Sequence, residues 1–520
     1  MSASPPEPHW LEELQRSREA ALAQGGPEKI ARQHAKGRQT ARERIAALFD
    51  PASFQEYGML TASEFPEMRS KTPADGKITG WGNIEGRMVA VAADDSTVLA
   101  GAGGKIAMAK VKRHMEYAIR KGMPFVNLGD AGGVRMPDNM GSANMMGMVE
   151  SNYGQPRRRQ IPMVSTIMGE CFGDPSWSAA RGDIVVMVKG CTMAVAGPKI
   201  LADATGERVT NEELGGWQLH ARVTGQVDLF AEDEAECLAL VRKVLGYLPS
   251  NADELPPVVD TGDAPERPQD ELLRILPASN RTAFDMHKVL DVIFDKGSVV
   301  ELKPEYDRSL ITALARLNGR TVGIYANNSM GQAGAMGWGA CEKATALICL
   351  CDSFHIPFIG FHDTPGFFAS KAAEEHKMPL KIMTFLDALH QSTVPRIGVI
   401  VRKSYGFAHR HMIGGSVPAD TLLAWPTADV SFMAPEGAVN VVYGRRIAES
   451  ADPAAERAHY LAEINRANRP WESAALHLVD AVIDPRETRM ELIRALRRAQ
   501  GPNGERGRSR RHLANWPTGF

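Results

Sequence analysis

Paired cysteines and long apolar runs are missing from this chain of 520 residues. Its six cysteines include no CxxC pair, which argues against a zinc ribbon and for reduced thiols. No apolar run reaches the roughly 18–20 residues of a membrane span. The opening MSASPPEPHW has neither the apolar core of a signal peptide nor the Arg-rich pattern of a transit peptide. With a net charge of only −2, no general bias toward nucleic acid is present. We therefore expect a cytoplasmic protein without a membrane or nucleic-acid partner.

The length of the chain predicts two domains, because 520 residues exceed what one hydrophobic core usually supports. The first 50 residues read as two helices around a basic segment, and the residues from about 501 onward read as a mobile, solvated end. A stretch rich in proline and acidic residues, without periodicity, separates the two halves and is typical of a linker. The predicted parts are a helical segment over 1–50, a first domain over 51–250, a linker over 251–271, a second domain over 272–510 and a tail over 511–520.

An internal repeat is the most informative feature of the sequence. Identical residues recur 233 positions apart without a gap: Gly86 and Gly319, Val89 and Val322, Lys110 and Lys343, Pro124 and Pro357, Phe125 and Phe358, Asp130 and Asp363, Gly133 and Gly366, Pro162 and Pro395, Gly173 and Gly406. Single glycines recur by chance, but chance matches do not keep one register over about 88 residues. We conclude that one fold occurs twice by duplication.

Each copy alternates strands with helices. A hairpin-like stretch and a glycine-rich loop precede an amphipathic helix, over roughly 105–121 in the first copy and 338–354 in the second. A short strand, a glycine loop, a second helix and a third strand follow. This order indicates βαβ units and a largely parallel sheet in each domain, that is, an α/β fold.

Five separated stretches resemble motifs of a single family: AKGRQTARERIAALFDPASFQEYG, ATGERVTNEELGG, LGYLPSN, EKATALICLCDSFHIPFIGFHDTPGF and TVPRIGVIVRKSYG. They are similar to the carboxyltransferase, or β, subunits of acyl-CoA carboxylases, in particular the propionyl-CoA and methylcrotonyl-CoA enzymes. The resemblance implies two tandem crotonase-like domains, which agrees with the repeat found independently of it.

The resemblance also implies an assembly and a set of partners. It predicts a homohexamer whose active sites lie between two subunits, with acyl-CoA held by the N-terminal domain of one and carboxybiotin by the C-terminal domain of the other. The chain itself has no biotinyl-lysine context and no ATP-grasp pattern. Biotin would therefore be carried by a separate α subunit.

The implied chemistry needs two sets of hydrogen-bond donors. Carboxyl transfer beside a thioester builds an enolate, and release of CO2 from carboxybiotin leaves negative charge on the ureido oxygen. Main-chain amides at a turn before a helix stabilise such charge. We predict that Gly406, Phe407 and Ala408 contact the biotin oxygen, and that Gly173 and Asp174 contact the thioester oxygen. The family needs no side chain as base, because the biotin nitrogen takes the proton, and no metal-ligand cluster stands out.

The remaining site residues are assigned to cofactor binding or to substrate selection. The predicted cofactor-binding residues are Lys105, Lys110, Gly132, Gly133, Arg135 and Tyr405, of which the three cations are candidates for the CoA phosphates. His409 and Arg410 are predicted to select the substrate. Ser404 is not expected to be a nucleophile, because no GxSxG surrounds it. Asp130 and Asp363 are expected to cap the helices that follow them.

Both glycine loops depart from the Gly-Gly-Ala pattern of the family. In the first, Asp174 places a carboxylate near the enolate and Pro175 has no N–H to donate. In the second, Phe407 fills space expected for the biotin ring and does not easily adopt a positive φ. Losing one such donor typically raises a barrier by about 2.7–4 kcal/mol. Arg410 stands where relatives carry a small or acidic residue, which suggests an acyl group bearing a carboxylate.

Three interpretations stay open. The first is a biotin-dependent acyl-CoA carboxyltransferase with an unusual substrate and a biotinylated partner. The second is a biotin-independent acyl-CoA decarboxylase or carboxyl transferase on the same fold. The third is a non-catalytic structural subunit of a mixed carboxylase hexamer. Phe407 and Pro175 keep the last two open.

Overall fold

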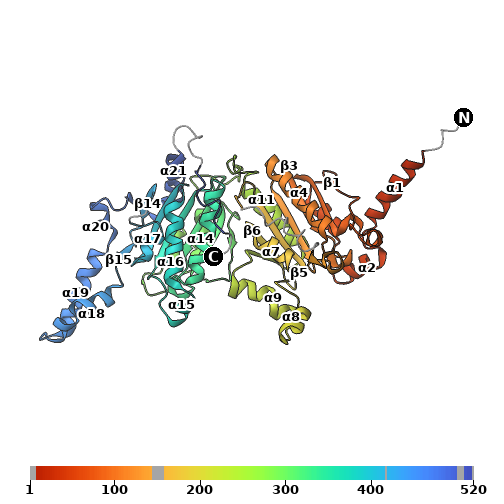
Figure 1. The fold of residues 1–520 in the computed structure, drawn as a ribbon. Coiled ribbons are helices and arrows are strands. Elements are labelled where there is room, and N and C mark those ends of the chain that lie inside the picture. The colour runs from red at the N-terminus through yellow and green to blue at the C-terminus, as the bar shows by residue number, and fades with distance from the viewer. Residues whose placement is uncertain (1–7, 143–156, 416–418, 501–508, 518–520) are drawn as a thin grey trace. The chain divides into compact units, whose positions relative to one another are not determined.

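The structure is a computed structural model that describes residues 8–142, 157–415, 419–500 and 509–517. The chain divides into two compact units, Met1–Glu254 and Leu255–Phe520. Each unit contains one mixed sheet and its own helices (Figure 1). The predicted fold class, two tandem α/β domains with largely parallel sheets, is confirmed.

The first unit has an eight-stranded sheet in the order β1-β2-β3-β4-β5-β6-β8, with β7 paired to β5. The hairpin β2–β3 turns at Glu85 and Gly86, which both have positive φ, as a two-residue type I′ turn requires. From β3 onward the strands run parallel. The strands are β1 (Gln55–Tyr57), β2 (Lys77–Ile84), β3 (Arg87–Asp94), β4 (Phe125–Ala131), β5 (Met163–Phe172), β6 (Ile184–Val188), β7 (Thr192–Ala194) and β8 (Leu229–Ala231).

The second unit repeats this plan in the order β16-β14-β13-β12-β11-β10-β9, with β15 paired to β13. Its hairpin β10–β11 turns at Asn318 and Gly319, a dipeptide that favours the same turn type. The strands are β9 (Val300–Leu302), β10 (Leu310–Leu317), β11 (Arg320–Asn327), β12 (Phe358–Thr364), β13 (Arg396–Tyr405), β14 (Thr421–Ala424), β15 (Asp429–Ser431) and β16 (Ala481–Val482).

Helices of eight or more residues accompany each sheet. Among the described residues of the first unit they are α1 (His9–Leu22), α2 (Pro27–Ala35), α3 (Ala41–Leu48), α4 (Lys105–Lys121), α8 (Pro198–Thr205) and α11 (Glu234–Tyr247). In the second unit they are α13 (Met286–Ile293), α14 (Trp338–Ser353), α16 (Met378–Gln391), α18 (Pro435–Ala448), α19 (Pro453–Ala467) and α21 (Thr488–Gln500). The helices predicted over 105–121 and 338–354 are α4 and α14. Almost all of α14 is buried, so it is less amphipathic than expected.

The 233-residue register found in the sequence is also present in the structure. Strands β2 to β5 begin and end 233 residues before β10 to β13. The isolated bridge between Gly103 and Val134 has its counterpart between Met336 and Phe367. Duplication therefore explains the architecture down to single bridges.

The two ends of the chain differ from the sequence expectation. Three helices, not two, lie within the first 50 residues. Residues 501–508 lie outside the described part, but 509–517 do not form a free tail. Ser509 Oγ donates to the Asp352 carbonyl at 2.7 Å, and the Leu513 amide donates to the Asp352 carboxylate at 2.9 Å. Because Leu513 is fully buried, this segment belongs to the second unit. In the described residues, no helix combines the length and apolarity needed to cross a membrane.

Candidate active site

Two loops with the same main-chain geometry follow the third parallel strand of each unit. Gly173 ends β5 with φ 67° and Gly406 ends β13 with φ 62°, a region that favours glycine. The Gly173 amide donates to Ala194 at 3.2 Å, and the Gly406 amide donates to Ser431 at 3.0 Å. Each glycine carbonyl then accepts the amide three residues later, that of Ser176 at 2.9 Å or of His409 at 3.2 Å. The sequence and the backbone thus agree that these loops are equivalent.

The second loop, Gly406–Ala408, leaves amides available. Phe407 has φ −66° and ψ −23°, so the expected backbone strain does not arise; the positive φ belongs to Gly406. Within the part of the chain that the structure describes, the amides of Phe407 and Ala408 have no hydrogen-bond acceptor. Ala408 is fully buried and Phe407 is 42% exposed. Of the two residues, Phe407 is therefore the one that borders solvent.

The Phe407 ring lies at the edge of this loop. Its centroid is 5.1 Å from that of His411 in an edge-to-face contact, and the Arg410 guanidinium lies 5.5 Å above the ring. This cation–π geometry holds the Arg410 charge beside the loop. The predicted substrate-selecting cation is thus placed next to the predicted donors.

Two fully buried side chains, His362 and Ser404, and the partly buried His409 meet directly behind the loop. Ser404 Oγ lies 2.9 Å from His362 Nδ1 and 2.8 Å from His409 Nδ1. Burial lowers the pKa of His362 well below its usual range, and burial together with Arg410 lowers that of His409 to about 4. Both rings are therefore neutral at neutral pH. The strand spacing of His362 and Ser404 carries no motif, and the sequence analysis missed this cluster.

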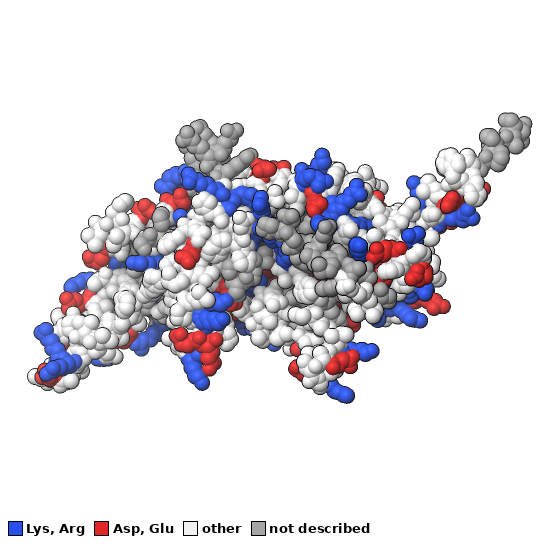
Figure 2. All heavy atoms as spheres, viewed as in Figure 1, with Lys and Arg blue, Asp and Glu red and all other residues white. Residues whose placement is uncertain are grey.

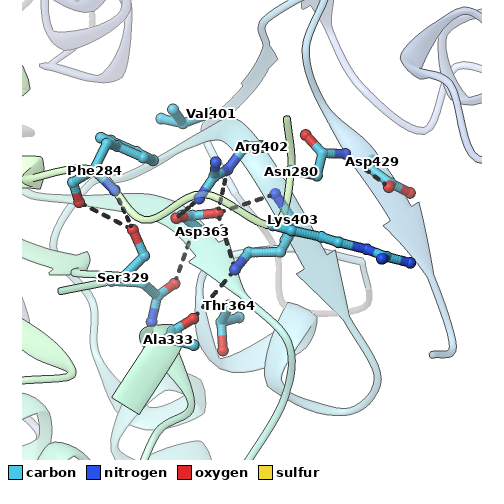
Figure 3. A network of polar contacts seen from close by, with 12 residues as sticks. Asn280, Phe284, Ser329, Ala333, Asp363, Thr364, Val401, Arg402, Lys403 and Asp429 are labelled. Carbon is cyan, nitrogen blue, oxygen red and sulfur yellow. Dashed lines mark hydrogen bonds and ion pairs between the residues drawn. The ribbon is translucent and has the colours of Figure 1, made fainter. Parts of the chain in front are cut away.

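Asp363 anchors the end of β13 from the side. Arg402 donates Nε and Nη2 to its two oxygens at 3.0 and 2.9 Å, and Lys403 Nζ lies 3.9 Å away (Figure 3). The Asp363 amide donates to Asn327 at 3.1 Å. The expectation that Asp363 caps the following helix is wrong, because its carboxylate is occupied by Arg402. A cavity of about 630 Å³ borders this network and is lined in part by Lys403, Tyr405 and Asp429.

Asp130 fills the equivalent place in the first unit with a different partner. Arg44 of α3 donates to it at 2.9 Å and Gln33 of α2 at 3.1 Å, so Asp130 is not a helix cap either. The position of Arg402 is taken by Gly169, where an added Cβ would lie 1.7 Å from Asp130 Oδ1. The Asp130 carboxylate is therefore held by Arg44 of the distant helix α3, and the Asp363 carboxylate by Arg402 of strand β13 itself.

A buried ion pair lies in the first unit near the Gly173 loop. Lys77 Nζ contacts Asp94, and the pair occupies the positions that Leu310 and Asn327 hold in the second unit. Burial alone would lower the pKa of Lys77, but Asp94 and, more weakly, Asp174 raise it above its usual value. The Lys77 charge thus lies within electrostatic reach of Asp174, although its direct partner is Asp94. The sequence analysis missed this pair, since isolated charges in a strand carry no motif.

Two of the residues predicted to bind CoA, Lys110 and Arg135, are buried and already bonded within the first unit. Lys110 Nζ donates to the Gly58 carbonyl at 2.9 Å, to Thr61 Oγ1 at 3.0 Å and to the Ala74 carbonyl at 2.9 Å. Burial lowers its pKa to about 8. Arg135 is also buried and pairs with Asp75 and Asp138.

The other predicted cofactor-binding residues stay predictions. Lys105 is 46% exposed and lies 3.9 Å from Glu64, so its charge can reach a ligand. Gly132 and Gly133 follow β4, and Gly133 has φ 105°. Tyr405 is buried and donates its hydroxyl to Asp429 at 2.6 Å. On the face shown in Figure 2, basic and acidic side chains are interspersed in both units.

The fold and the paired loops define a carboxyltransferase of the two-sheet, crotonase-like kind, and comparison with known proteins leads to the same class. The family model "Carboxyl transferase domain" matches residues 32–511. The methylmalonyl-CoA carboxyltransferase 12S subunit of Propionibacterium freudenreichii subsp. shermanii is 36% identical over 491 residues, covering 94% of this chain and 93% of that protein.

Other relatives and a solved structure agree. The methylmalonyl-CoA decarboxylase subunit alpha of Veillonella parvula is 36% identical, covering 91% of this chain and 92% of the relative. The propionyl-CoA carboxylase carboxyltransferase subunit of Haloferax mediterranei is 37% identical, covering 94% and 95%. A crystal structure of the transcarboxylase 12S hexamer with methylmalonyl-coenzyme A and methylmalonic acid bound gives a TM-score of 0.89 at 35% identity, covering 96% of both chains. This chain belongs to the carboxyl transferase family of acyl-CoA carboxylases.

Proposed function

We propose that this chain is the carboxyltransferase subunit of a biotin-dependent acyl-CoA carboxylase, which moves a carboxyl group between biotin and the α- or γ-carbon of an acyl-CoA. The observation that carries the proposal is the Gly406–Ala408 loop, where two main-chain amides lack an acceptor in the described residues. Donors of this kind are fixed before charge develops, so they stabilise an oxyanion without reorganising. Family membership supplies the reaction class.

The residues of the second loop fit the biotin side. Phe407 N–H would hold the ureido oxygen, while its exposed ring leaves the amide open at the loop's edge. Carboxybiotin, carried by a partner, supplies the carboxyl group when bound. Tyr405 and its partner Asp429 would keep the end of β13 in place below this amide.

The first loop fits the acyl-CoA side. The main-chain N–H of Asp174 would contact the thioester oxygen, where the enolate charge develops, whereas the Gly173 N–H donates to Ala194 and fixes the turn. Pro175 is the second residue of helix α7 (Asp174–Ala180), a position whose N–H would have no partner within a helix. The proline therefore removes one donor from this loop. Lys105 would contact the CoA phosphates.

The partners and the setting follow from the same proposal. We expect a biotinylated α subunit, six copies of this chain in one assembly, and active sites completed by two subunits. The described cysteines are all buried and form no disulfide, which suits the reducing cytoplasm.

The reaction can be tested with the purified chain. A panel of acyl-CoA thioesters that carry a carboxyl group on the α-carbon is incubated with and without free biotin, and carboxybiotin and decarboxylated thioester are both measured. Carboxybiotin formation supports the proposal. Loss of the carboxyl group at the same rate without biotin instead supports the alternative, a biotin-independent decarboxylase. No turnover with any thioester, with or without a biotinylated partner, would favour the structural subunit.

Arg410 predicts the class of acyl group. Because its charge lies beside the loop, a second carboxylate on the acyl chain would bind it by a charge-assisted hydrogen bond worth about 1.5–3 kcal/mol. Arg410→Ala is expected to raise KM roughly 10- to 100-fold for acyl-CoAs that carry this carboxylate, and much less for neutral ones. Equal losses on both would remove Arg410 from substrate selection.

A further inference from the structure

Two side chains close the Gly406 loop from either end. Ser404 precedes the loop and His409 follows it, and their side chains meet at 2.8 Å. The His409 amide also donates to the Gly406 carbonyl at 3.2 Å. A main-chain bond and a side-chain bond from the same histidine therefore fix the turn that presents the Phe407 amide.

His362 ties this closure to the neighbouring strand. It lies on β12, fully buried, with Nδ1 2.9 Å from Ser404 Oγ. A serine hydroxyl has one hydrogen, so it donates to one imidazole and accepts from the other. Two neutral rings of opposite tautomer therefore satisfy both contacts of the hydroxyl, while the buried His362 Nε2 has no hydrogen-bond partner in the described residues.

The ring of His409 is held against main chain on its other side. A Cβ added at Gly414 would lie 2.4 Å from His409 Cε1 and 2.5 Å from Nε2. Only glycine leaves room for the ring at this point. The Nε2 side of His409 thus faces Gly414, and its Nδ1 side faces Ser404.

In the first unit, a different hydrogen bond stabilises the equivalent loop. Ser176, equivalent to His409, donates Oγ to the Gly173 carbonyl at 2.7 Å. Gly129 and Cys171 stand in place of His362 and Ser404. In the described residues, the side-chain link from the loop to the adjacent strand at these three positions is therefore seen in the second unit and is not repeated at the equivalent positions of the first.

We infer that His362, Ser404 and His409 form a hydrogen-bonded clasp of three positioning residues, which holds the Phe407 amide in the orientation that a negatively charged ureido oxygen requires. The inference rests on the proposed function for the ligand, but the clasp itself is a property of the loop. It predicts that the Nδ1 position of each histidine matters and the Nε2 position does not.

Substitutions by asparagine and glutamine distinguish the roles of the two ring nitrogens. The amide of Asn reaches the place of Nδ1, and the amide of Gln reaches the place of Nε2. His409→Asn is expected to retain most of the kcat for carboxyl transfer to biotin. His409→Gln and Ser404→Ala are expected to lose at least tenfold in kcat with little change in KM for acyl-CoA. His390→Asn, on the exposed face of α16, is the matched control. The reverse order, with Gln active and Asn inactive, would show that His409 acts through Nε2 and overturn the clasp.

Hydrogen exchange decides the question even if no turnover is found. Mass spectrometry of peptides spanning 404–412 reports how well the loop is held. Ser404→Ala and His409→Gln are expected to speed exchange there at least tenfold, whereas His409→Asn stays close to the wild type. A wild-type protein without carboxyl transfer but with this exchange pattern would refute the proposed function and keep the clasp. Equal exchange in all variants would refute the clasp.

Discussion

At the scale of single residues, burial separates structural cations from those that can bind a ligand. Lys110 and Lys343 occupy equivalent positions, and both donate to main-chain carbonyls of the loops below them. Burial lowers the pKa of each to about 8. The duplication has therefore preserved a lysine as an internal hydrogen-bond donor. Lys105, five residues earlier on the same helix, is half exposed.

This contrast gives a paired prediction. Lys110→Met removes the three hydrogen bonds that the ammonium group donates to Gly58, Thr61 and Ala74 and should lower the free energy of unfolding by about 1–3 kcal/mol, with KM for acyl-CoA unchanged. Lys105→Met should raise KM for acyl-CoA several-fold and leave stability nearly unaltered. Urea denaturation and steady-state kinetics measure both effects. A stable Lys110→Met variant with a raised KM would restore Lys110 to the CoA site.

At the scale of elements, periodicity and turn residues predicted much of the fold. The Asn318-Gly319 and Glu85-Gly86 turns and the 233-residue register locate hairpins and parallel strands that the structure contains. Side-chain partners across elements were not predictable in this way. The clasp between β12 and β13 depends on which residues the sheet brings opposite each other, and no local pattern encodes that.

One contact between elements makes stability depend on pH. His287, near the start of α13, lies 2.9 Å from Glu301 of β9 and 2.7 Å from Asp285. The hydrogen bond to Glu301, with that to Asp285, raises the pKa of His287 to about 9. A raised histidine pKa stabilises the fold fully below the unfolded value of about 6.5, and this contribution is lost as the pH rises through about 9.

His287→Gln should therefore lower the melting temperature most at pH 6 and progressively less between pH 7 and 9.5. Because His287 is partly exposed, solvent screening limits the effect to under about 1 kcal/mol. Glu301→Gln is the matched variant and should show the same pH trend. Calorimetric scans across this pH range measure the melting temperatures. A difference in melting temperature between wild type and variant that does not change with pH would show that the ion pairs of His287 do not stabilise α13.

At the scale of the whole molecule, we expect exposed apolar surface to mark the place where copies of the chain meet in the proposed hexamer. In the second unit, Tyr443 of α18 stacks on Tyr460 of α19 at 3.8 Å, while Val441 and Val442 on α18 are 73% and 66% exposed. Exposed apolar clusters of this kind are typical of protein–protein interfaces. The 233-residue register could not predict this surface, because α18 lies beyond the stretch where that register was found.

The proposed hexamer is testable on this surface. Six copies of 56.6 kDa give a mass of about 340 kDa in native mass spectrometry. Replacing Val441 and Val442 by glutamate buries two charges if α18 lies in an interface, and each unpaired buried charge costs several kcal/mol. The double variant should therefore dissociate to smaller species and lose carboxyl transfer, since the proposed active site needs two subunits. Asn440→Glu, exposed on the side of the same helix away from the two valines, should leave the mass at six copies. A double variant that stays hexameric would place the interface elsewhere, and a wild-type complex containing a second, related chain would favour the mixed hexamer.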